Sequence, residues 1–142
     1  MNKSFKHLPP DKRKKIVLLC DDIRVFSGVA TVAKEIVSQT AHHFNWVNIA
    51  GAIKHPEQGK VLDLSKSAND ELGIDDSNIK LYCVDSYGTD EQVLGILAQE
   101  KPDALMLFTD PRYFQHVFAC EDKIRKHCPI FYLNIWDDYP AP

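Results

Sequence analysis

The sequence predicts an α/β protein with a Rossmann-like, doubly wound parallel sheet. Three observations support this prediction: short apolar runs recur along the 142 residues, segments with helical periodicity separate them, and capping or turn residues stand at the junctions. Strands that alternate with helices imply a parallel sheet with helices on both faces and right-handed crossovers. A chain of this length is sufficient for one domain with a buried core.

The apolar runs define the expected strands, because each is short, rich in β-branched or aromatic residues and bounded by polar ones. Five core strands are expected at residues 16–20, 44–49, 79–84, 104–108 and 130–135, and a short edge strand at 61–64. The helices between them are expected to begin at the capping residues Ser27, Ser65, Thr89 and Asp110. Tyr113, Val117, Cys120 and Ile124 form the expected buried stripe of the last helix.

The turn after the first strand is a candidate anion site. Ser27 is a plausible N-cap, and Gly28 has no Cβ, so a ligand can approach the backbone closely there. The next free N–H groups, near Val29, would point past the carboxyl end of the strand at the positive end of the helix dipole. We therefore predict that Ser27, Gly28 and Val29 contact a phosphate. The alternative is that Gly28 only permits a tight turn.

Polar residues follow the expected strands at the edge where ligands bind in parallel α/β sheets. These rim residues are Asp21, Asp22, Arg24, Gly51, Asp85, Tyr87, Thr109, Asp110, Arg112, Trp136, Asp137 and Asp138. Carboxylates can bind sugar hydroxyls, and the aromatic rings offer faces for sugar C–H groups. Asp110 is the candidate catalytic residue, although N-capping also explains it. We expect no metal site, because neighbouring carboxylates on a strand point apart.

Three segments resemble glycosyltransferases of the GT-B class. Residues 20–36 read CDDIRVFSGVATVAKEI, which is similar to the glycine-containing first loop and following amphipathic helix of that class. Residues 108–113 (FTDPRY) and 132–140 (YLNIWDDYP) resemble segments of the phage-type members. This resemblance implies the N-terminal half of a two-domain enzyme that needs no cofactor or metal. A nucleotide-sugar donor would be held mainly by the second domain, while this domain contacts the acceptor and, near Gly28, the donor phosphates.

Two alternatives remain from the sequence. One is a response-regulator receiver domain, in which Asp21 and Asp22 would hold Mg²⁺ and Asp85 would accept a phosphoryl group, although no lysine ends the last strand. The other is a non-catalytic Rossmann-like binding module; a dinucleotide site is disfavoured because the first turn lacks a G-x-G-x-x-G motif.

Composition narrows the function classes further. The net charge is −3, so we expect no nucleic-acid partner other than a nucleic acid that accepts the transferred sugar. No apolar run is long enough for a membrane span. Four cysteines without a C-x-x-C pair indicate reduced core thiols in a cytoplasmic protein. The basic residues 1–15 are expected to be a flexible leader before the domain at 16–142. The chain stops soon after the last strand, which favours the N-terminal part of a longer protein over a short protein with an extended tail.

Overall fold

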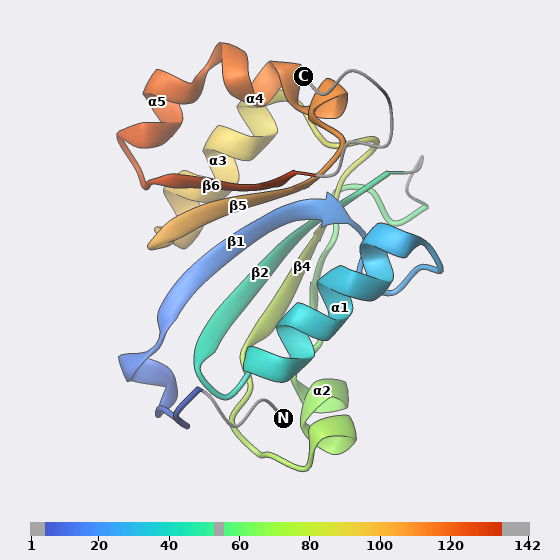
Figure 1. Ribbon diagram of the computed structural model, residues 1–142, viewed down its shortest axis with the longest axis vertical. Coiled ribbons are helices and arrows are strands. Elements are labelled where there is room, and N and C mark those ends of the chain that lie inside the picture. Colours follow the sequence, from blue (N-terminus) through green and yellow to red (C-terminus); the bar gives the residue numbers. More distant parts are fainter. Residues whose placement is uncertain (1–4, 53–55, 135–142) are drawn as a thin grey trace.

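The computed structural model describes residues 5–52 and 56–134, which form a twisted six-stranded sheet (Figure 1). The strand order is β3-β4-β2-β1-β5-β6. The strands are β1 (Lys14–Asp21), β2 (Phe44–Gly51), β3 (Val61–Asp63), β4 (Ile79–Cys83), β5 (Ala104–Thr109) and β6 (Ile130–Asn134). All neighbours are parallel except the short edge strand β3, which runs antiparallel to β4. The predicted α/β, Rossmann-like doubly wound fold is confirmed.

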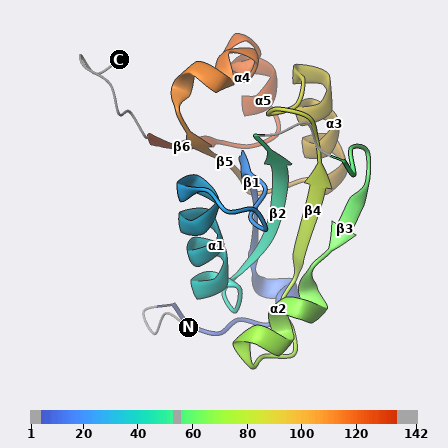
Figure 2. The ribbon, with the colours of Figure 1, turned by 90° about the vertical axis from the view of Figure 1, so that its right-hand side faces the viewer.

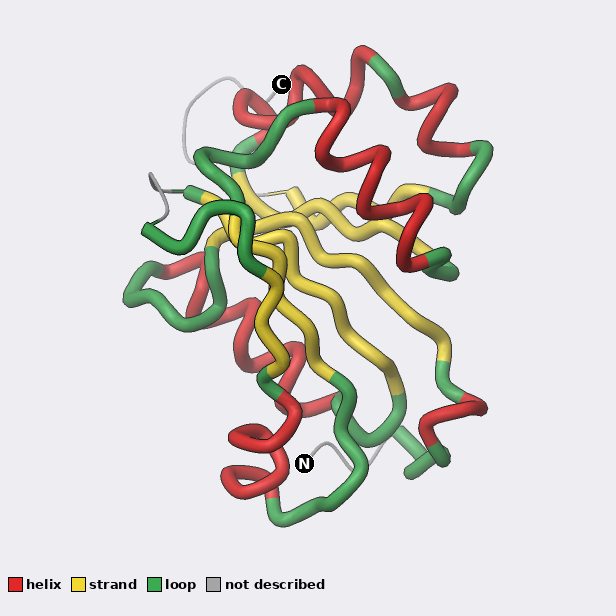
Figure 3. The backbone as a smooth tube through the Cα atoms, turned by 180° about the vertical axis from the view of Figure 1, so that it is seen from behind, coloured by secondary structure: helices red, strands yellow, loops and turns green. Residues whose placement is uncertain are grey.

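Helices cover both faces of the sheet. One face carries α1 (Gly28–Thr40) and α2 (Ser65–Leu72), and the other carries α3 (Asp90–Glu100), α4 (Gln115–Ala119) and α5 (Glu121–Arg125), as Figure 2 and the smooth trace in Figure 3 show. Two 3₁₀ turns, η1 (Pro10–Lys12) and η2 (Pro111–Phe114), complete the described elements. The central strand β1 alternates between the two cores: Val17 and Leu19 pack towards α3–α5, and Leu18 and Cys20 towards α1 and α2.

The positions of the four cysteines agree with the expected reduced thiols in the core. All four are buried and unpaired. Burial raises the pKa of each thiol, most strongly that of Cys20, so the thiolate is disfavoured. These side chains therefore act as small apolar groups.

The expected last helix is divided into η2, α4 and α5. The Asp110 side chain accepts a hydrogen bond from the Arg112 N–H, and the turn that follows is 3₁₀ rather than α-helical. Because a 3₁₀ turn has about three residues per turn, it changes which side chains face the sheet. Phe114 is fully buried, whereas Tyr113, expected in the buried stripe, is more than half exposed.

Much of the expected leader packs against the domain. The Leu8 N–H donates to the His42 carbonyl at 2.9 Å, and a ring nitrogen of His42 contacts the Phe5 carbonyl at 2.7 Å. Arg13 is buried, with its guanidinium bonded to the carbonyl of Asp76 and paired with its carboxylate. Since β1 also begins at Lys14, the folded domain starts before the boundary expected at residue 16.

Candidate ligand site at the carboxyl edge

The carboxyl ends of β1 and β5 lie side by side at the point where the strand order changes direction across the sheet. Counting only the parallel strands in chain order, the sheet reads 3-2-1-4-5, so β2 and β4 lie on one side of β1 while β5 and β6 lie on the other. Open α/β sheets bind ligands beyond such a switch point. Asp21 ends β1 and Thr109 ends β5, which places two predicted rim residues at this position.

A buried hydrogen-bond network joins three of the predicted residues. The Tyr87 hydroxyl donates to one Asp21 carboxylate oxygen at 2.7 Å, and the Ser27 hydroxyl donates to the other at 2.7 Å. Asp21 and Tyr87 are both buried. Burial, together with the neighbouring Asp21 carboxylate, raises the pKa of Tyr87, so its phenol stays protonated and keeps donating. Asp21 therefore fixes the loop after β4 against the start of α1.

Several hydrogen bonds hold the loop between β1 and α1 in a single conformation. The Asp22 N–H donates to the Gly51 carbonyl at 3.3 Å, and the Ile23 N–H donates to the side-chain oxygen of Asn48 at 3.2 Å. The Arg24 N–H and guanidinium both donate to the buried Asp22 carboxylate. These bonds attach the first turn to β2 and to the buried Asp22.

The N-terminus of α1 presents unused donors beside this loop. Ser27 caps the helix as predicted, because its hydroxyl oxygen accepts the Ala30 N–H at 2.9 Å. Within the described part of the chain, the N–H groups of Gly28 and Val29 have no acceptor, and they are orphan donors of the first turn. A Cβ built on Gly28 would meet nothing within 4 Å. Gly28 is exposed and Val29 is half-buried, so the helix begins at the protein surface.

The Asp110 carboxylate is held by its neighbour rather than left available for proton transfer. It accepts the backbone N–H and the Nε of Arg112 at 2.9 Å each, and the Arg112 Nη2 also donates to it. Hydrogen bonds from Arg112 lower the pKa of Asp110, which makes it a weak base. These contacts support the capping interpretation of Asp110.

The site also contains residues that were not predicted to belong to it. Tyr113 lies with its ring 5.3 Å from that of Tyr87, and a ring nitrogen of His116 contacts the Tyr87 carbonyl at 3.0 Å. Phe26, at the tip of the first loop, is fully exposed. The sequence signal for Asn48 is an asparagine inside the apolar strand 44–49. The signal for Phe26 is an aromatic residue directly before a helix cap.

The structure does not bring every predicted rim residue to this position. Asp85 follows β4, which is separated from β1 by β2. A receiver domain needs the strand order 2-1-3-4-5, which puts its phosphoacceptor strand beside the first strand. The observed order therefore does not fit the receiver alternative. Trp136, Asp137 and Asp138 lie outside the described residues.

Searches among known proteins found no matching family model, no curated relative and no matching solved structure. Among residues 5–52 and 56–134, no group of three or more histidine, cysteine or acidic side chains could hold a metal ion. Within the same residues, no helix is both long and apolar enough to cross a membrane.

Replacing Asn48 with leucine is expected to loosen the first loop. The substitution leaves the buried Ile23 N–H without its acceptor and removes the bond from Asn48 to the Leu18 carbonyl. We expect a loss of about 1–3 kcal/mol in the free energy of unfolding and faster amide exchange at Ile23. Asn45→Leu is the matched control, because Asn45 lies on the same strand but binds Pro10. Equal exchange at Ile23 in both variants would contradict this role.

Proposed function

We propose that this chain is the acceptor-side domain of a glycosyltransferase and contacts the phosphates of a nucleotide-sugar donor at the N-terminus of α1. The observation that carries the proposal is the pair of N–H groups at Gly28 and Val29, which lack an acceptor in the described residues and begin the helix that follows β1 at the switch point, where Gly28 is exposed. Two aligned donors at the positive end of a 13-residue helix favour an anion.

The surroundings of these donors favour a ligand that carries rings as well as phosphate. Phe26 and Tyr113 expose aromatic faces at the same edge of the sheet, and such faces can stack on a nucleobase or a sugar. A nucleoside diphosphate sugar combines these features, and the resemblance of residues 20–36 to GT-B glycosyltransferases points to the same class.

The roles proposed for individual residues follow from their contacts. Gly28 and Val29 would bind donor phosphate through their backbone, with Ser27 keeping the helix end in place. Asp21 acts as a positioning residue, because Ser27 and Tyr87 already use both of its carboxylate oxygens. Transfer would need the second domain that the resemblance implies, so binding is the activity to test on this chain.

Titration of the ¹⁵N-labelled chain with UDP-glucose, GDP-mannose and ADP-glucose tests the proposal. We expect at least one of them to shift the Gly28 and Val29 amide signals in a saturable way, with a Kd below about 1 mM. Inorganic phosphate and free glucose serve as controls and should bind far more weakly. If none of the nucleotide sugars shifts these two amides, or if phosphate alone does so equally, the proposal fails.

Gly28→Val is expected to weaken the binding of that nucleotide sugar by about tenfold or more, equivalent to about 1.4 kcal/mol. The valine side chain would add bulk at the residue whose N–H we propose binds phosphate, while its Cβ would meet no other part of the protein within 4 Å. Thermal unfolding should therefore remain close to that of the wild type. An unchanged Kd in a folded Gly28→Val variant would remove Gly28 from the site.

A non-catalytic dinucleotide-binding module is the second candidate, because the strand order 3-2-1-4-5 is also that of dinucleotide-binding Rossmann folds. Including NAD in the same titration separates the two candidates. Tighter binding of NAD than of any nucleotide sugar would favour the module, despite the missing glycine motif.

A further inference from the structure

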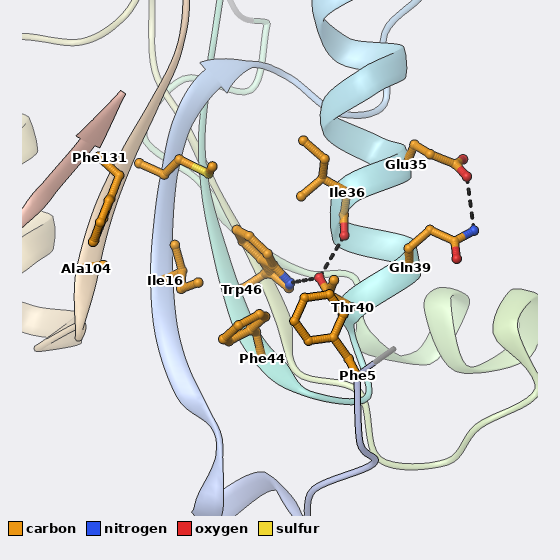
Figure 4. A pocket seen from close by; sticks show the side chains of 11 residues that line it. Phe5, Ile16, Glu35, Ile36, Gln39, Thr40, Phe44, Trp46, Ala104 and Phe131 are labelled. Atoms are coloured by element: carbon orange, nitrogen blue, oxygen red, sulfur yellow. Dashed lines mark hydrogen bonds between the residues drawn. The ribbon is translucent and has the colours of Figure 1, made fainter. Parts of the chain in front are cut away.

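We draw no further inference here: the strongest candidate, the apolar groove of about 540 Å³ beside α1 that Phe44, Trp46 and Phe131 help to line (Figure 4), carries nothing because nothing in the described part of the structure shows what covers it.

Discussion

Gly51→Ala should lower the free energy of unfolding by about 3 kcal/mol, through overpacking against rigid backbone. A Cβ at Gly51 would lie 2.0 Å from the Ser86 carbonyl oxygen and 3.0 Å from the Tyr87 ring. The carbonyl has little freedom to retreat, because it accepts the Ala52 N–H at 2.7 Å. Ala52 and Ser86 also adopt positive φ angles of 82° and 51°, so both residues already hold an unusual conformation.

The same substitution should disturb the ligand site, because Ser86 immediately precedes Tyr87. Moving this loop pulls the Tyr87 hydroxyl away from Asp21, which anchors the start of α1 through Ser27. Urea unfolding measures the loss of stability, and the amide signals of the first loop report the displacement. Gly95→Ala is the control: nothing lies within 4 Å of its Cβ in the middle of α3, and we expect a gain of about 0.5–1 kcal/mol. Similar stabilities for the two variants would refute the steric argument.

Glu100→Gln is expected to destabilise the protein by about 1–3 kcal/mol at pH 7. The Glu100 carboxylate, 3% exposed, ends α3 and accepts bonds from the Tyr82 hydroxyl, from Lys80 at 3.1 Å and from Lys15 at 3.3 Å. Glutamine keeps the shape but removes the charge that both lysines face. Because each lysine is about one-third exposed, water screens part of the interaction, so we expect less than the full cost of breaking a buried ion pair.

The pH dependence identifies the charge as the cause. Burial alone would raise the pKa of Glu100, but the bonds from Tyr82, Lys80 and Lys15 outweigh it and lower the pKa. A lowered pKa in the folded state gives stability that is present above the unfolded value of about 4.3 and lost as the pH falls through the folded value. The difference between wild type and Glu100→Gln should therefore shrink from pH 7 to pH 3.

Urea unfolding at pH 7 and pH 3 measures the difference in the free energy of unfolding between wild type and Glu100→Gln. Glu91→Gln is a suitable control, since Glu91 lies exposed at the start of the same helix. A difference between wild type and Glu100→Gln that stays constant from pH 7 to pH 3 would show that the charge contributes nothing.

Short-range features could be predicted from the sequence because they depend on residues within a few positions of one another. Ser27 caps α1, Thr89 and Gln92 form the predicted capping box, and Gly73 ends α2 in the left-handed conformation. The cap expected at Ser65 is different. Ser65 is already helical, and its N–H donates to Asp63, while its hydroxyl accepts the Ile79 N–H from β4. A contact with a distant strand changed the role of this serine.

The apolar runs and helical periods were sufficient to predict the parallel α/β sheet, because burial on two faces requires continuous apolar strands. The strand order was decided only by the tertiary structure, since the repeated strand and helix pattern does not fix the direction in which each crossover turns. That order joins Tyr87 to Asp21, 66 positions apart, and separates Asp85 from β1. It also leaves Phe131 exposed beside α1. Contacts between distant residues thus determine which side chains form the site and which apolar surface remains open.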